Sequence, residues 1–335
     1  MAQFLGLLLL SFFITSVLIV PFIDLLYKLR FRRRKQETKD VFEKKTPIFD
    51  KLHGWKTGTP VGGGILVVLL VTLITLWSLA LLGIKGKVWE IFVLLFAFLS
   101  FGLLGFVDDL CKFFVEKKTG FFGLRFRHKL AIQLLLAFTI GLIFYLKLGY
   151  DFIFIHWLGK VDIGPLFVFF STLAIVFFAN AFNITDGLDG LSSGLLMICL
   201  GAFGILAARI LDPVLGVFIS VWLGSLIAFL YFNVYPARIW LGDVGALSFG
   251  ATLAVVGLLT GKIVALGVVG GVFVVEALSS LIQLLAKKYW GKKVLEVAPL
   301  HLFFQYKGWE EPKIVARFWL AGIMFAVFGL WLAAV

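Results

Sequence analysis

The chain has 335 residues, of which 61% are hydrophobic and only 15% carry a charged side chain. This balance excludes an ordinary soluble domain and indicates that a bilayer surrounds most of the chain. The formal net charge of +12 does not indicate nucleic-acid binding, because the basic residues lie between apolar runs and form no continuous basic face. Cys111 and Cys199 have neither metal-type nor disulfide-framework spacing, and we interpret both as reduced structural residues.

Ten apolar runs are long enough to cross a hydrocarbon core, which takes about 20 helical residues. The first begins without a basic leader and continues to a cationic stretch, so we interpret it as a retained span. The ninth contains Gly270, Gly271 and Glu276, and we expect it to tilt or break. The predicted spans are residues 3–27, 61–82, 89–109, 128–148, 164–181, 188–209, 212–231, 244–260, 262–288 and 313–334.

The Lys and Arg residues indicate an orientation for these spans. Of the 31, 25 lie in residues 28–59, 110–129 and 287–317 or at Arg238, and the remaining six lie in the opposite connections. The positive-inside rule makes the larger set cytoplasmic and both termini extracytoplasmic. The sequence therefore predicts an all-α integral membrane protein with about ten transmembrane helices, folded as one polytopic domain over residues 1–335. The basic run in the loop of residues 28–59 is interpreted as a topology signal that attracts anionic lipids.

Acidic residues at cytoplasmic ends of different spans are the main functional signal, because acids at membrane depth usually mark function. Asp108 and Asp109 close the third span, where the helix dipole disfavours negative charge. Either Lys112 compensates them at helical spacing, or they bind magnesium or accept a proton from a phosphate hydroxyl. The acids of this set are Asp108, Asp109, Asp186, Asp189 and Asp243.

Polar residues recur at three-residue steps before the sixth span, at Asn180, Asn183, Asp186 and Asp189. In a helix these would share one face. Alternatively, Asp186 caps the sixth span and Asp189 lies in its first turn. Capping accounts for one acid but not for two Asn, two Asp and two Gly together, so the segment is predicted to be catalytic or to bind a ligand.

The eighth span opens with Gly242-Asp243-Val-Gly245, after a short connection that contains Asn233, Arg238 and Trp240. Glycines permit close approach of the backbone, and free amides at a helix start favour an anion such as phosphate. Asp243 is either a helix cap or, with the other acids, a magnesium ligand.

Two further segments carry candidate residues. The stretch from Lys56 to Gly64 lacks the Walker spacing, so it either permits close helix packing or forms a phosphate-facing loop supported by Lys56. His301 lies in the last cytoplasmic loop, and the other histidines have no recognisable partner spacing.

In these segments the chain resembles the polyprenyl-phosphate N-acetylhexosamine-1-phosphate transferases, and especially their phospho-N-acetylmuramoyl-pentapeptide transferase branch. The resemblance covers nearly the whole chain, and the block from Asn183 to Gly190 is its most specific part. The Ala-Pro-Leu-His and Glu-Pro-Lys-Ile-Val elements favour this branch. The matching segments are Lys56 to Gly63, Asp108-Asp109, Asn180 to Gly190, Asn233 to Gly245, Ala298 to His301 and Glu311 to Val315.

The resemblance implies a ten-span fold with outward termini, in agreement with the charge distribution. It also implies that undecaprenyl phosphate attacks the β-phosphate of UDP-N-acetylmuramoyl-pentapeptide at the cytoplasmic face of a bacterial inner membrane, releasing UMP and leaving lipid I. We expect a Mg²⁺ cofactor and a homodimer. Membrane lipids are expected as partners, and nucleic acid is not.

By matching motifs, the resemblance implies that Asp243 holds the metal, together with Asp108 and Asp109, which also serve the lipid phosphate or proton transfer. His301 is a further catalytic candidate, and Trp240 is expected to stack on the uracil ring. The substrate-binding candidates are Lys56, Asn180, Asn183, Asp186, Asp189, Asn233, Trp240 and Gln283.

One departure is that Leu302 and Phe303 stand where the family has two further histidines. This leaves two alternatives close to the main prediction, namely another donor such as UDP-N-acetylglucosamine and an inactive binding homologue. An alternative of another class is a lipid-linked sugar transporter, since ten spans and buried acids also suit transport. The absence of an evident inverted repeat and the location of the acids on one side argue against transport.

Overall fold

The protein is a bundle of long helices in a computed structural model, which describes residues 2–32, 56–84, 86–112 and 124–334. Nine helices within these residues are long and apolar enough to cross a bilayer, and a bent pair of helices passes the same test when its two parts are taken together. Nine of the ten predicted spans are therefore found as single helices, with ends that shift by a few residues, and the ninth predicted span is the bent pair. The helices are α1 (Ala2–Lys28), α3 (Gly63–Leu81), α4 (Val88–Leu110), α6 (Phe126–Leu146), α7 (Leu166–Thr185), α8 (Leu191–Arg209), α9 (Pro213–Asn233), α10 (Gly242–Leu259), α11 (Ile263–Val269), α12 (Gly271–Tyr289), α13 (Leu300–Tyr306) and α14 (Glu311–Ala334).

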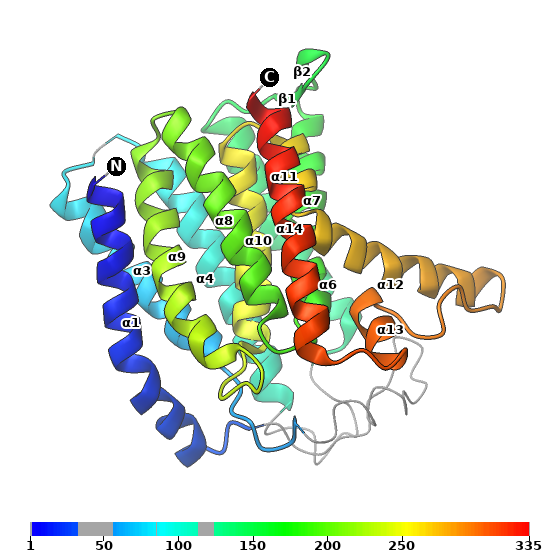
Figure 1. The fold of residues 1–335 in the computed structure, drawn as a ribbon. Coiled ribbons are helices and arrows are strands. Elements are labelled where there is room, and N and C mark those ends of the chain that lie inside the picture. Colours follow the sequence, from blue (N-terminus) through cyan, green and yellow to red (C-terminus); the bar gives the residue numbers. More distant parts are fainter. Residues whose placement is uncertain (1, 33–55, 85, 113–123, 335) are drawn as a thin grey trace.

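The bent pair is the ninth predicted span. Helix α11 ends at Val269, and α12 leaves it at an angle of 76° after Gly270. In Figure 1, α12 runs sideways and away from the bundle. The predicted break is thus confirmed, and it leaves a row of apolar side chains on α12 exposed: Leu278, Leu281, Ile282 and Leu285.

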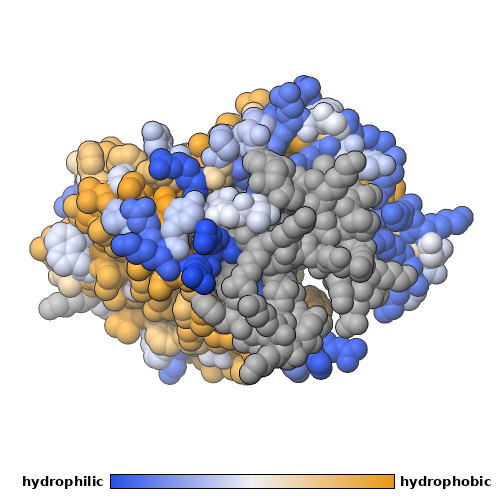
Figure 2. Space-filling view, turned by 90° about the horizontal axis from the view of Figure 1, so that it is seen from below, coloured by the Kyte–Doolittle hydropathy of each residue, from blue (hydrophilic) through white to orange (hydrophobic). Residues whose placement is uncertain are grey.

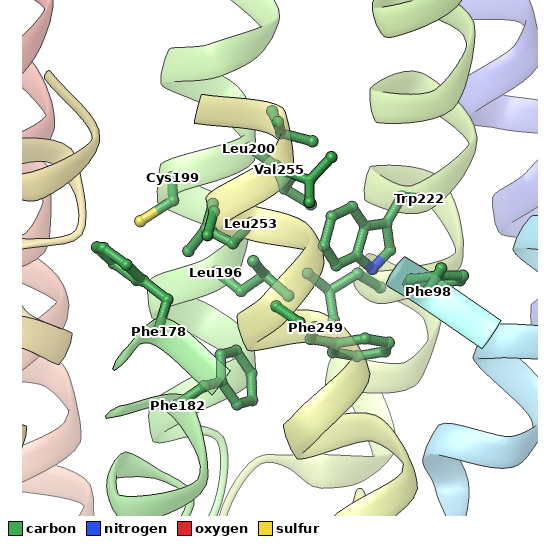
Figure 3. Close-up of a cluster of buried hydrophobic side chains, with 14 of the residues drawn as sticks. Phe98, Phe178, Phe182, Leu196, Cys199, Leu200, Trp222, Phe249, Leu253 and Val255 are labelled. Carbon is green, nitrogen blue, oxygen red and sulfur yellow. The ribbon is translucent and has the colours of Figure 1, made fainter. Parts of the chain in front are cut away.

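Helix α10 is the centre of the bundle, and every residue from Val244 to Leu259 is buried. It packs against α4 and α7, and aromatic rings fill the space between the helices. Figure 3 shows Phe249 of α10 beside Phe98, Trp222 and Phe182, and the first two of these ring centroids lie 5.8 and 5.4 Å from that of Phe249. This apolar packing fixes the height of α10 relative to α4, and hence the place of their polar ends.

Glycine allows α4 and α3 to approach α10 closely. A Cβ at Gly105 would overlap the backbone carbonyl of Asp243, and one at Gly64 would overlap the backbone of Gly245. Small residues at such crossings are typical of membrane helices. The helix-packing interpretation therefore holds for the glycines that begin α3.

The all-helical prediction needs one correction, because a short hairpin joins α6 to α7. Strands β1 (Phe152–Ile155) and β2 (Gly159–Asp162) pair antiparallel at the upper end of the bundle in Figure 1. These strands have only four residues each, which is too short for a clear alternating pattern.

We call the opposite end of the bundle the lower end; there α1, α4, α7 and α9 finish and α3, α6, α8, α10 and α14 begin. Figure 2 looks onto this end, where hydrophilic residues gather. The N-terminal end of α1 and the C-terminal end of α14 both lie at the upper end (Figure 1). Which side of a membrane each end faces stays a prediction from the charge distribution.

Candidate active site

Three carboxylates converge at the lower end, and we call them, with two lysines, the open cluster: Asp108, Asp109, Asp243, Lys112 and Lys129. Lys112 Nζ lies 3.1 Å from Asp108, 3.9 Å from Asp109 and 2.8 Å from Asp243. Lys129 Nζ lies 2.9 Å from Asp108 and 2.6 Å from Asp243. The structure thus brings together acids that are separated by more than 130 residues in the chain.

The helices explain this convergence. Asp108 and Asp109 lie in the last turn of α4, Asp243 in the first turn of α10, and the contact at Gly105 holds those two ends together. Leu241, not Asp243, is the N-cap of α10, so the capping alternative for Asp243 is wrong. Instead, Asp243 accepts a hydrogen bond of 3.3 Å from Asn183 Nδ2.

The pairing of Lys112 with Asp108 that the sequence suggested is present, but Lys112 also reaches Asp243. Burial disfavours the charged lysine, yet Asp243, Asp108 and Asp109 outweigh it and raise the pKa of Lys112 above its usual value. Lys112 is therefore a firmly positive group. In the open cluster, three carboxyl groups thus face two lysine side chains.

The donors of the open cluster fit magnesium by their chemistry. Within the described residues, no group of three or more His, Cys, Asp or Glu side chains surrounds a common point. Magnesium needs fewer, because it usually binds one or two carboxylates and completes its shell with water and substrate phosphates. Asp243, with Asp109 or Asp108, supplies such a pair of hard oxygen ligands, and the side chain of Asp243 is 15% exposed.

A second ion network, which we call the closed cluster, consists of Lys56, Asp189 and Glu311. Lys56 Nζ donates to Asp189 Oδ1 at 2.7 Å and to Glu311 Oε1, and all three side chains are at most 4% exposed. Asp189 also accepts hydrogen bonds from the indole of Trp240, at 3.2 Å, and from Ala237 N, at 2.9 Å. Lys56 Nζ lies 5.6 Å from the centroid of the Trp240 ring. The predicted residues Lys56, Asp189 and Trp240 are thus neighbours.

Asp186 lies between the two clusters. It follows the last residue of α7 and accepts a hydrogen bond from Ser192 Oγ, and Gly190 is the N-cap of α8. The interpretation of Asp186 as the cap of the sixth span is therefore wrong. Burial raises the pKa of Asp186 to about 6, although the Ser192 hydroxyl favours the ionised form. The carboxylates of Asp243 and Asp189 act in the same direction as burial.

His301 is buried and held by Glu276 of α12. Its Nδ1 lies 2.8 Å from Glu276 Oε2, and its backbone N donates to Glu276 Oε1 at 3.0 Å. The other ring nitrogen faces the backbone after Asp186, since a Cβ at Gly187 would overlap His301 Nε2. Glu276 thus joins α12, which follows the break, to α13.

The remaining predicted residues hold the surrounding backbone or one another. Asn233 accepts from Ser193 Oγ and donates to Ile239 O, both at 3.0 Å. Asn180 Nδ2 donates to Gln133 Oε1 at 2.7 Å. Gln283 hydrogen-bonds to the backbone of residues 294 and 295 and, among the described residues, forms no hydrogen bond with either cluster. A role of these side chains in binding substrate stays a prediction.

Three charged residues that the sequence did not single out as site residues contact predicted ones in the structure: Lys129, Glu276 and Glu311. Lys129 lies at the start of a span and Glu311 at the start of the last, where charges also serve topology. The available signal for Glu311 was its membership of the Glu-Pro-Lys-Ile-Val element.

Comparison with known proteins agrees with this arrangement. A family model described as glycosyl transferase family 4 matches residues 91–261, which include Asp108, Asp109, Asp186, Asp189 and Asp243. The chain belongs to glycosyl transferase family 4. The chain is thus a multi-pass membrane transferase. The family match includes all residues of the open cluster but excludes Lys56 and Glu311.

Three proteins similar to this chain over nearly its whole length carry the name phospho-N-acetylmuramoyl-pentapeptide-transferase. The protein from Shouchella clausii (strain KSM-K16) is 38% identical over 97% of this chain and 96% of the relative. That from Geobacillus sp. (strain WCH70) is 35% identical over 96% and 95%. That from Caldanaerobacter subterraneus subsp. tengcongensis (strain DSM 15242 / JCM 11007 / NBRC 100824 / MB4) is 35% identical over 94% of both. The similarity therefore extends to Lys56 and Glu311, beyond the family match.

Proposed function

We propose that the chain transfers phospho-N-acetylmuramoyl-pentapeptide from its UDP donor to undecaprenyl phosphate, releasing UMP and forming lipid I for peptidoglycan synthesis. The observation that carries the proposal is the open cluster, in which carboxylates of α4 and α10 meet on two lysines at one end of a membrane bundle. The relatives' names supply the substrate class. The lower end is proposed to face the cytoplasm of a bacterium, across its inner membrane.

The reaction brings two phosphate groups together, so negative charge must be neutralised. Lys112 and Lys129 supply positive charge where α4, α6 and α10 meet, and both pair with Asp243. Each lysine can bind the substrate when a phosphate oxygen replaces Asp243 as the partner of its ammonium group. Asp108 or Asp109 accepts the proton of the attacking phosphate hydroxyl on a carboxylate oxygen. Magnesium, held by Asp243 with Asp109 or Asp108, supplies charge neutralisation when bound.

The closed cluster and Trp240 form the proposed nucleotide side of the site. An indole ring offers a face on which a pyrimidine can stack, and the hydrogen bond to Asp189 fixes its orientation. Asp186 and Asn183 lie between this side and the open cluster, where the diphosphate of the donor would extend.

A comparison of donors tests the proposal. The purified chain in detergent, with undecaprenyl phosphate and Mg²⁺, is expected to release UMP from UDP-N-acetylmuramoyl-pentapeptide and much more slowly from UDP-N-acetylglucosamine. Faster release from the second donor would replace the proposed substrate. Release from neither by a folded protein would refute the transferase activity proposed here, and movement of lipid-linked sugar across vesicles without UMP release would favour transport. A homodimer stays a prediction.

A further inference from the structure

Glu311, the first residue of α14, connects two sides of the proposed nucleotide pocket through one oxygen atom. Its Oε1 accepts from Lys56 Nζ and, at 2.6 Å, from the backbone N of Asp189. Lys56 precedes α3 and Asp189 precedes α8, so these contacts cross 255 and 122 residues of the chain. One carboxylate oxygen thus adds a second link between Lys56 and Asp189, beside their direct ion pair.

The groups that Glu311 holds in turn orient the pocket. Asp189 receives the hydrogen bonds of Trp240 and Ala237, and Lys56 lies beside the Trp240 ring. Without the carboxylate of Glu311, Asp189 N loses its acceptor and Lys56 loses one of its two carboxylate partners. Both residues would then sample other positions, and Trp240 would lose its fixed partner.

The charges of the closed cluster indicate more than a structural ion pair. Two buried carboxylates share one ammonium, and Glu311 Oε2 is buried without a hydrogen-bond partner among the described residues. A buried carboxylate oxygen that accepts no hydrogen bond destabilises the fold. A side chain selected for stability alone would have both oxygens hydrogen-bonded, so this arrangement indicates that Glu311 acts on the positions of its neighbours.

We propose that Glu311 is a positioning residue of the donor pocket, which acts through Lys56 and Asp189 to fix the nucleotide side around Trp240. It touches neither the reacting phosphates nor the open cluster. The inference rests on the proposed function, because a uridine nucleotide is the ligand that this side is expected to bind. It assigns to the last span a part in binding that the family match, which ends at residue 261, does not cover.

The test compares Glu311→Gln with the matched control Glu310→Gln in the full chain. Glu310 is the preceding residue and is exposed, so the control makes the same change of charge at the same helix end. Glu311→Gln is expected to raise the KM for the UDP donor, and the Kd for UMP measured by calorimetry, by about 10- to 100-fold. The KM for undecaprenyl phosphate should change by less than about twofold, and the control should match the unaltered protein.

Unchanged donor KM and UMP affinity in Glu311→Gln would overturn the inference. A lower melting temperature with equal loss for donor and lipid would also overturn it, because that pattern shows a purely structural role. Glu311→Asp retains the charge on a shorter stem and should give a smaller rise in the same two constants; it serves if the glutamine variant does not fold. UMP binding separates the two proposals. A chain that binds UMP but transfers nothing refutes the proposed function. In that case the UMP affinities of Glu311→Gln and Glu310→Gln still decide whether Glu311 positions the pocket.

Discussion

The two ion clusters at the lower end differ in composition and in access to solvent. In the open cluster three carboxylates share two lysines, and Lys112 and Asp243 are 20% and 15% exposed. In the closed cluster two carboxylates share one lysine, and no side chain is more than 4% exposed. Both have more carboxylates than ammonium groups. Of the two clusters, only the open one can therefore replace a contact between lysine and carboxylate by a contact with a ligand while the surrounding helices stay folded.

This difference indicates a division of work. A partly exposed cluster with more carboxyl groups than lysines can bind a divalent cation and then phosphates, because water and ions reach it. A sealed cluster holds backbone segments at fixed positions, since breaking one buried ion pair leaves the other charge without compensation. Variants should therefore affect chemistry in the open cluster and binding in the closed one.

The largest effect is expected from Asp243→Ala in the open cluster. Loss of the residue that links α10 to both lysines should lower the rate of UMP release about 1,000-fold or more, while the helical content measured by circular dichroism stays the same. Removal of Mg²⁺ with a chelator should abolish release by the unaltered protein, and added Mg²⁺ should restore it. A variant that keeps its activity would refute the metal role and leave the reaction in place.

Gly105→Ala should separate the two halves of the open cluster without changing a charge. The new methyl group would overlap the carbonyl of Asp243, so α4 must move away from α10. We expect a loss of about 1 to 3 kcal/mol of stability, from overpacking, and about 100-fold in rate, from misplacement of the carboxylates. Gly102→Ala is the control on the same helix, because its nearest neighbour would lie 3.6 Å away. Equal behaviour of the two variants would contradict the close-contact argument.

Asp186 gives a pH-dependent effect between the clusters. Its pKa is about 6 in the folded protein and lies near 4 in an unfolded chain. Because the folded state binds this proton more tightly, the stabilising contribution is full below about pH 4 and is lost as the pH rises through about 6. Asp186→Asn should therefore melt at a higher temperature than the unaltered protein at pH 8, and lose this advantage at pH 4. Differential scanning fluorimetry in chelator would show this, and a pH-independent difference would argue against burial as the cause.

The smallest effect is expected at the upper end, far from both clusters. Asp212 caps α9 by accepting from Val214 N and Leu215 N, and it pairs with Lys87 Nζ at 2.7 Å. Asp212→Ala should cost about 1 kcal/mol of stability, the usual loss for a helix cap. UMP release at a temperature where the variant is folded should equal that of the unaltered protein. A large loss of activity would mean that the two ends are coupled.

The spans and the break could be predicted because they depend on local sequence. Length and hydropathy fix where a helix crosses a bilayer, and Gly270-Gly271 marked the bend before α12. The convergence of Asp108 with Asp243 could be proposed only from topology, since it depends on how α4 packs against α10. Lys129 and Glu311 were missed because a charge near a span end has the same local pattern whether it orients the chain or pairs inside the bundle.

The closed cluster also sets an order of events when the chain is made. Glu311 is synthesised 255 residues after Lys56, and every other helix of the bundle precedes it in the chain. Until α14 enters the bilayer, the open cluster can assemble from α4, α6 and α10, but Lys56 and Asp189 lack their common acceptor. The nucleotide side is therefore the last part of the site to be completed, and a chain arrested before its final span would hold the catalytic carboxylates without a finished pocket for the donor.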